Sequence, residues 1–235
     1  MSAAASHDSA GVPRETVVSL LRYETGHFLA SVGMALGWSL RVEGSRHVPR
    51  RGPALLVANH QSYLDPVAVG LGCPRRLYYL ARKTLFRNHF FAWLIRGFNA
   101  VPIDQEMGKE GLQMVLRLLK AGRPVLVFPE GERTSTGQMQ PLKAGIHLLL
   151  KRASAPVLPV GVAGAFHAWP RWRKYPSPAP LFCAPTPGTV AVSIGRPRES
   201  TALASLPRED ALARLFDEMQ IVVARAEKLR RQDHQ

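Results

Sequence analysis

The sequence predicts a single layered α/β domain, with a mostly parallel or mixed central sheet flanked by helices, plus an N-terminal membrane-associating helix. Three observations lead to this prediction. Short apolar runs alternate with helix-compatible segments, as a layered α/β arrangement requires. The 235 residues are enough for one full hydrophobic core. An apolar, uncharged stretch near the N-terminus predicts the additional helix.

The N-terminal region divides into a tail and a helix. Residues 1–14 are small, polar and unpatterned, so we expect a disordered tail without the pattern of a signal peptide. Residues 15–42 are helix-compatible, and no Lys, Arg, Asp or Glu falls between Thr25 and Leu40. The uncharged stretch from Thr25 to Leu40 is shorter than the roughly 20 residues that a spanning helix needs. We therefore predict an interfacial helix; a helix packed on the protein's own core is the alternative.

Residues 43–235 are predicted to form the α/β domain. The strands are apolar runs of four to six residues, and the longer helices carry an apolar stripe on one face. The expected strands are residues 54–58, 77–81, 100–103, 125–128, 157–162 and 189–194. The expected helices are residues 67–71, 88–97, 109–121, 143–153 and 208–230. Residues 169–187 are rich in proline and predict a long exposed loop.

A histidine follows the first predicted strand, with a carboxylate five residues later. His60 and Asp65 lie between the apolar run 54–58 and the next predicted helix. The carboxylate could accept a hydrogen bond from one ring nitrogen, which leaves the other free to take a proton from a substrate hydroxyl. Taken alone, the pair leaves an alternative open, because Asp65 before Pro66 could simply cap a helix.

A second polar turn follows the strand at 125–128. It contains Glu130, Gly131 and Arg133. Arginine offers a planar fork of donors that suits a phosphate or a carboxylate, and glycine lets the backbone turn or approach a ligand closely. A polar turn with a local ion pair is the alternative. A further apolar run, 156–162, carries no reactive group and predicts scaffolding or a lining for an apolar ligand.

In order and spacing, these segments resemble the family of 1-acylglycerol-3-phosphate O-acyltransferases. His60 and Asp65 match the family's H-x-x-x-x-D motif, and residues 128–133 match its F-P-E-G-x-R motif. Residues 158–160 match its last apolar motif. The resemblance spans roughly residues 48–196 and rests on ordered motifs that are each weak singly.

The resemblance implies transfer of a fatty acyl group from an acyl thioester to the hydroxyl of a lysophospholipid. The first acceptor it suggests is 1-acylglycerol-3-phosphate, which would give phosphatidic acid. His60 is then the general base, and Asp65 fixes its tautomer. Arg133 binds the acceptor's anionic headgroup, with Glu130 and Gly131 shaping its turn. Residues around the motifs offer no clear serine or cysteine nucleophile, so the alcohol would attack the thioester directly.

One departure from the family pattern concerns the acceptor. The second motif commonly ends in Asp-Arg, and here it ends in Asp104–Gln105. In the family that arginine is associated with the acceptor's phosphate, whereas glutamine supplies no charge. Either Arg133 and Lys83 carry the anion, or the headgroup is not a simple phosphomonoester. Glycerol-3-phosphate, another lysophospholipid or a lyso-aminolipid stays open as acceptor, as does a non-catalytic lipid-binding protein.

Charge predicts the class of partner. The chain has 31 Lys and Arg against 17 Asp and Glu, a formal net charge of +14. Such a surplus favours an anionic partner, and an anionic membrane surface and either acyl donor, acyl-CoA or acyl carrier protein, fit. Nucleic acid is not expected, because it leaves the ordered motifs unexplained. Trp169, Trp172 and Tyr175 alternate with basic residues, which is typical of a membrane interface.

Cysteine usage and motifs bound the compartment and the cofactors. Cys73 and Cys183 provide no disulfide framework, which favours a reducing compartment. We expect a membrane-associated protein at the cytoplasmic face, on the inner membrane if the source is bacterial. The sequence shows no Cys–His cluster with metal spacing and no glycine-rich dinucleotide loop. No metal and no cofactor are therefore expected beyond the thioester substrate.

Overall fold

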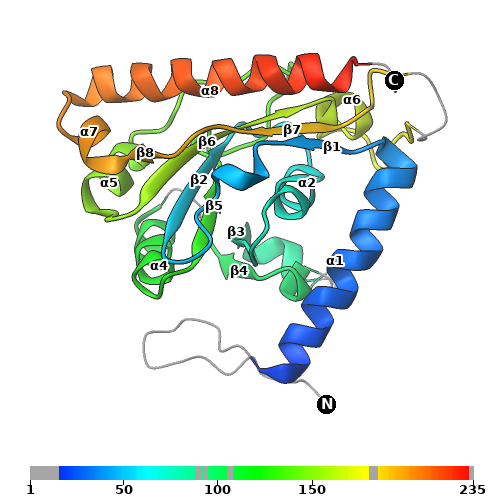
Figure 1. The fold of residues 1–235 in the computed structure, drawn as a ribbon, viewed down its shortest axis with the longest axis horizontal. Coiled ribbons are helices and arrows are strands. Elements are labelled where there is room, and N and C mark those ends of the chain that lie inside the picture. Colours follow the sequence, from blue (N-terminus) through cyan, green and yellow to red (C-terminus); the bar gives the residue numbers. More distant parts are fainter. Residues whose placement is uncertain (1–15, 88–91, 93–94, 105–107, 180–184, 233–235) are drawn as a thin grey trace.

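One sheet runs through the centre of the molecule. The computed structural model describes residues 16–87, 92, 95–104, 108–179 and 185–232. Within them the sheet has eight strands in the order β1-β7-β6-β2-β5-β3-β4, with β8 paired to β6 (Figure 1). The strands are β1 (Arg41–Glu43), β2 (Ala54–Ala58), β3 (Tyr78–Arg82), β4 (Ala100–Ile103), β5 (Pro124–Val127), β6 (Pro156–Ala163), β7 (Ala191–Ile194) and β8 (Arg198–Glu199).

The sheet is mixed and mostly parallel, which confirms the predicted fold class. Strand β2 lies parallel to β5 and β6, and β3 lies parallel to β4 and β5. Only β7 and β8 run antiparallel to β6 among the described pairs. Because parallel strands end at the same edge, the loops that follow β2, β3 and β5 meet there. The two motif turns therefore come together in space.

Helices cover both faces of the sheet (Figure 1). They are α1 (Val17–Trp38), α2 (Asp65–Gly72), α4 (Lys109–Lys120), α5 (Gly145–Arg152), α6 (Ala165–Ala168), α7 (Ser200–Ala204) and α8 (Arg208–Arg230). Two short 3₁₀ turns, Ser45–His47 and Lys83–Phe86, precede β2 and follow β3. Helix α8 has the predicted bounds, and α4 ends one residue earlier than predicted.

Alternating residues of the strands build a separate core on each face. In β2, Leu55 and Val57 pack with α4, α5, α7 and α8, whereas Leu56 and Ala58 face the α1 and α2 side. All five residues of β2 are buried. Burial on both faces explains why this strand is a continuous apolar run rather than an alternating one.

Helix α1 starts at a capping box and packs only part of its surface on the domain. Thr16 Oγ1 accepts from the backbone N–H of Ser19 at 3.1 Å, and Ser19 Oγ accepts from that of Thr16 at 2.8 Å. Tyr23 and Met34 are buried. Another face exposes a run of apolar side chains: Val17, Val18, Leu21, Phe28, Leu29, Val32 and Leu36. Across the described residues, we find no helix with both the length and the apolar character to cross a bilayer.

Some elements differ from the prediction. Strands β1 and β8 and helices α6 and α7 were not predicted, because they are at most five residues long and owe their existence to their neighbours. The predicted exposed loop 169–187 is wrong in part: Pro170 and Ala179 are buried, and the N–H of Ala179 donates to the carbonyl of Gly37 at 2.6 Å. The predicted tail 1–14 and most of the predicted helix 88–97 lie outside the described residues.

Candidate active site

The loop after β2 is anchored to the neighbouring strand. Asn59 Nδ2 donates to the carbonyl of Val162 at 2.9 Å, and the N–H of Val162 donates to Asn59 Oδ1 at 2.7 Å. Both polar ends of a buried amide side chain are thus satisfied. This pair fixes the position from which the next residue, His60, projects.

His60 and Asp65 form a short contact. His60 Nδ1 lies 2.8 Å from Asp65 Oδ2, and the Asp65 side chain has no exposed surface. The same carboxylate oxygen accepts from the backbone N–H groups of Gln61 at 2.5 Å and Ser62 at 2.7 Å. An ionised carboxylate has no proton to donate, so Nδ1 of His60 donates to Asp65, and in the neutral ring Nε2 carries no proton.

The ring and the backbone of His60 are held by the segment that follows β5. Its ring stacks on Phe128, with centroids 4.0 Å apart, and its backbone N–H donates to Glu130 Oε1 at 2.7 Å. Glu130 Oε2 accepts from the N–H of Gln140, also at 2.7 Å. Burial raises the pKa of Glu130 to about 7, although the two backbone donors act in the opposite direction. Glu130 is therefore a buried support for the His60 loop.

The turn at 131–134 places an arginine beside the histidine loop. Gly131 has a φ of 74°, a left-handed conformation that favours glycine. The N–H of Thr134 donates to the carbonyl of His60 at 2.9 Å, which ties the two motif turns together. The Arg133 guanidinium lies over the Tyr63 ring, with Cζ 3.5 Å from the centroid, and its buried Nη1 has no hydrogen-bond partner among the described residues.

A cavity of about 440 Å³ opens beside these groups. His60 lies on its wall. Its apolar lining residues include Leu64, Val67, Leu85, Ile95, Phe98 and Phe128. Its polar lining residues include Arg82, Glu132, Arg133 and Arg171. A cavity that offers both apolar and basic side chains suits an amphiphile with an anionic end.

The structure brings together most of the predicted site residues, but not all of them. His60, Gly131 and Arg133 line the cavity, and Asp65 contacts His60 from behind. Glu130 is buried behind the turn. Lys83 does not line this cavity: Nζ pairs with Asp104 Oδ2 at 2.7 Å between two largely exposed side chains. Hydrogen bonding to Asp104 raises the pKa of Lys83.

Several residues that line the cavity were not assigned to the site from the sequence, among them Tyr63, Arg82, Trp169 and Arg171. Tyr63 lies within the first motif, so the motif itself was a signal for it. Trp169 was predicted only as a membrane-interface residue. It packs against Tyr63 with centroids 5.2 Å apart, and its carbonyl accepts from Ser62 Oγ at 2.8 Å. Gln105 lies outside the described residues.

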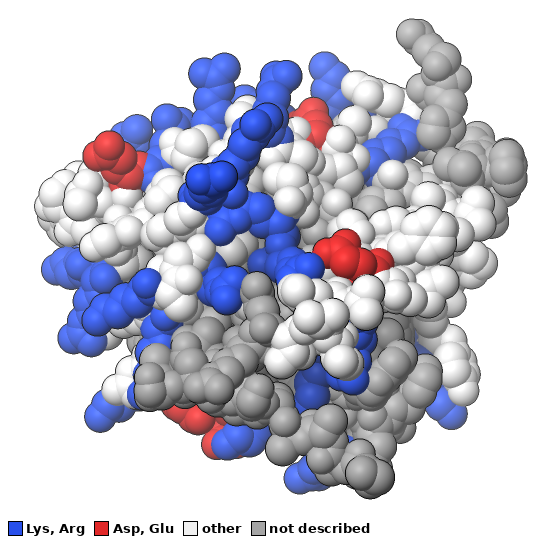
Figure 2. Space-filling view, turned by 60° about the horizontal axis from the view of Figure 1, so that its bottom comes forward, with Lys and Arg blue, Asp and Glu red and all other residues white. Residues whose placement is uncertain are grey.

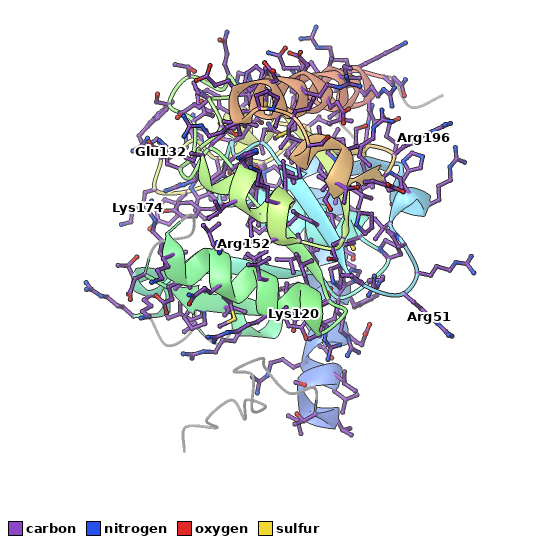
Figure 3. All side chains as sticks on the ribbon, turned by 90° about the vertical axis from the view of Figure 1, so that its left-hand side faces the viewer. Arg51, Lys120, Glu132, Arg152, Lys174 and Arg196 are labelled. Atoms are coloured by element: carbon purple, nitrogen blue, oxygen red, sulfur yellow. The ribbon has the colours of Figure 1, made fainter. Side chains whose placement is uncertain are left out.

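Two further observations concern a second cavity and possible metal ligands. A second cavity, of about 460 Å³, lies at another edge of the sheet and is lined by Arg196, Arg198 and Arg225 among others. Figure 3 shows Arg196 on the side of the molecule opposite Glu132. Among the described His, Cys, Asp and Glu side chains, none group in threes in a way that could hold a metal ion.

The fold and the site together define an α/β enzyme with a histidine–aspartate pair at the carboxyl edge of its sheet. The chain belongs to the acyltransferase family: the family model described as Acyltransferase matches residues 39–163. It is an enzyme of the O-acyltransferase type, and its predicted membership is confirmed.

Individual relatives agree with this assignment. The chain is 26% identical over 186 residues to the 1-acyl-sn-glycerol-3-phosphate acyltransferase of Bacillus subtilis, covering 78% of this chain and 86% of that protein. It is 30% identical over 165 residues to the enzyme of the same name from Pseudomonas aeruginosa, covering 68% of this chain and 59% of that protein. The crystal structure of the 1-acyl-sn-glycerophosphate acyltransferase of Thermotoga maritima superimposes with a TM-score of 0.69 at 25% identity, covering 93% and 82% of the two chains.

Proposed function

We propose that this enzyme transfers a fatty acyl group from an acyl thioester to the free hydroxyl of 1-acylglycerol-3-phosphate, which gives phosphatidic acid. One observation carries the proposal: the oriented imidazole of His60 lies on the wall of a cavity that is lined by both apolar and basic side chains. The names of the relatives support this choice of acceptor. The donor is acyl-CoA or acyl carrier protein.

The geometry suits general-base catalysis without a covalent acyl-enzyme. His60 Nε2 takes the proton of the acceptor hydroxyl while the hydroxyl oxygen attacks the thioester carbonyl carbon. The C–O bond forms, the C–S bond breaks, and the imidazolium returns its proton to the leaving thiolate. Asp65 holds the ring in the required tautomer and stabilises the imidazolium, because it is buried 2.8 Å from Nδ1.

The test of the function is a product assay with the purified enzyme. Radiolabelled 1-acylglycerol-3-phosphate is offered with acyl-CoA or with acyl carrier protein, and phosphatidic acid is quantified by chromatography. We expect phosphatidic acid with at least one donor. Glycerol-3-phosphate and lysophosphatidylcholine serve as competing acceptors. The proposed acceptor is wrong if either of them is acylated faster than 1-acylglycerol-3-phosphate, and the reaction is wrong if no acceptor is acylated.

The same enzyme is proposed to work on an anionic membrane surface. Phe28 and Leu29 of α1 are about two-thirds exposed, as are Trp172 and Tyr175 in the segment after α6. This segment is joined to the end of α1, because Trp38 Nε1 donates to the carbonyl of Ser177 at 2.8 Å. The hydrogen bond thus ties the segment that carries Trp172 and Tyr175 to the C-terminal end of α1. Figure 2 shows Lys and Arg gathered in a band across one face, with few acidic side chains beside it.

Membrane docking predicts a specific loss on adding charge to α1. The double variant Phe28→Asp, Leu29→Asp is expected to lower co-flotation with vesicles of phosphatidylglycerol and phosphatidylethanolamine by about tenfold or more, because burying a carboxylate in the interface is costly. Ile221→Asp is the control for an added carboxylate, since it places one at an exposed apolar position of α8, and it is compared with Phe28→Asp alone as well as with the double variant. Equal flotation of the double variant and the wild type would contradict the docking surface.

A further inference from the structure

Three guanidinium groups converge on the turn that follows β5, and they come from three different segments. Arg133 belongs to the turn itself. Arg82, the last residue of β3, donates through Nη2 to the carbonyl of Gly131 at 3.5 Å. Arg171, from the segment after α6, donates through Nη1 to the carbonyl of Arg133 at 3.3 Å. All three side chains line the cavity that contains His60.

This convergence leaves positive charge unbalanced. Among the acidic side chains that the structure describes, only Glu132 also lines this cavity. Glu132 pairs with Arg171 at 3.7 Å, and both side chains are about half exposed, so the pair contributes little. Glu130 is buried behind the turn and already accepts two backbone N–H groups. Three guanidinium groups and one carboxylate leave two positive charges, which matches the roughly two negative charges of a phosphomonoester near neutral pH.

The guanidinium of Arg133 is held in place by aromatic packing. It lies on the Tyr63 ring, and Tyr63 packs in turn on Trp169. The carbonyl of Trp169 is fixed by Ser62 Oγ at 2.8 Å, so the segment that carries Arg171 is anchored to the loop of the histidine motif. Figure 3 shows Glu132 and Lys174 on the same side of the molecule, as this anchoring requires.

We propose that Arg171 binds the phosphate of the acceptor together with Arg133 and Arg82, and so sets the preference for a phosphomonoester headgroup. The inference rests on the proposed acyl transfer to a lysophospholipid and names the group that selects it. The remaining N–H groups of Arg171 have no partner among the described residues, and they are available for charge-assisted hydrogen bonds to phosphate oxygens.

The test compares Arg171→Gln with Arg173→Gln. Arg173 lies two residues further along the same segment, does not line the cavity and donates to Ser177 Oγ, so its replacement removes the same charge from the same surface. Steady-state kinetics with 1-acylglycerol-3-phosphate give KM and kcat. Calorimetric binding of a short-chain 1-acylglycerol-3-phosphate, and of the matching phosphate-free 1-acylglycerol, is measured without any acyl donor.

Arg171→Gln is expected to raise both KM and Kd for the phosphate-bearing acceptor about tenfold or more, since hydrogen bonds to charged groups are the strong ones. Its kcat and its Kd for the phosphate-free lipid stay within about twofold of wild type, and Arg173→Gln behaves as wild type. The inference is overturned if Arg171→Gln binds both lipids as wild type does, or loses affinity for both equally. Because binding is read without donor, an enzyme that makes no phosphatidic acid disproves the proposed function but leaves this test decisive.

Discussion

Replacing His60 by alanine is expected to lower the rate of acyl transfer by about 10²- to 10⁴-fold, which is the usual contribution of a positioned general base. The loss should appear in kcat, because the proposed role of the side chain is to take the hydroxyl proton in the transition state. The fold is expected to survive. The His60 ring lies at the cavity wall, where it stacks on Phe128, so its removal enlarges a cavity that already exists.

The measurement is an initial rate of phosphatidic acid formation at saturating acceptor, together with a thermal unfolding curve. His47→Ala is the matched control, since His47 lines the other cavity and its Nδ1 lies 2.7 Å from the backbone carbonyl oxygen of Ile194. A folded His60→Ala enzyme that keeps more than about a tenth of the wild-type kcat would show that His60 is not the general base.

Replacing Asp65 by asparagine is the second large expected effect. The neutral amide cannot stabilise an imidazolium, and it no longer compels Nδ1 to carry the proton, so kcat is expected to fall by about 10²- to 10⁴-fold. Because Asp65 acts through His60, the double variant His60→Ala, Asp65→Asn should be no slower than His60→Ala alone. Independent contributions would instead multiply.

The control for Asp65 is Asp104→Asn, which removes an exposed carboxylate that pairs with Lys83 outside the cavity. Asp104→Asn should keep kcat within about twofold. Circular dichroism and thermal unfolding separate catalysis from stability, because buried Asp65 also accepts from the N–H groups of Gln61 and Ser62. An Asp65→Asn enzyme with wild-type kcat, or a double variant far slower than His60→Ala, would contradict this role.

The family's arginine is absent at position 105, and the structure shows which other cations lie near His60. Arg133 and Lys83 were the cations that the sequence offered in place of the arginine missing at position 105. The structure places Lys83 against Asp104 and brings Arg82 and Arg171 to the cavity instead. Arg82 and Lys83 are neighbours at the end of β3, where successive side chains point in different directions. The position of the strand end therefore decides that Arg82, and not Lys83, lines the cavity.

The longer strands and helices could be predicted from the amino-acid sequence. A strand that is buried on both sheet faces is a continuous apolar run, and a helix that packs on the sheet has a repeated apolar stripe. Strands β2 and β4 and helix α8 have their predicted bounds for this reason. The contact of His60 with Asp65 was also predicted from the sequence, because the two residues are only five positions apart.

The other contacts of the site, which join residues far apart in the chain, depend on the tertiary structure. Arg171 reaches Arg133 across 38 residues of chain, and Glu130 reaches the N–H of His60 across 70. Such contacts exist because parallel strands deliver distant loops to one edge of the sheet. No local pattern of residues encodes which of those loops meet, and the short strands β1 and β8 form only because a longer neighbour supplies their hydrogen bonds.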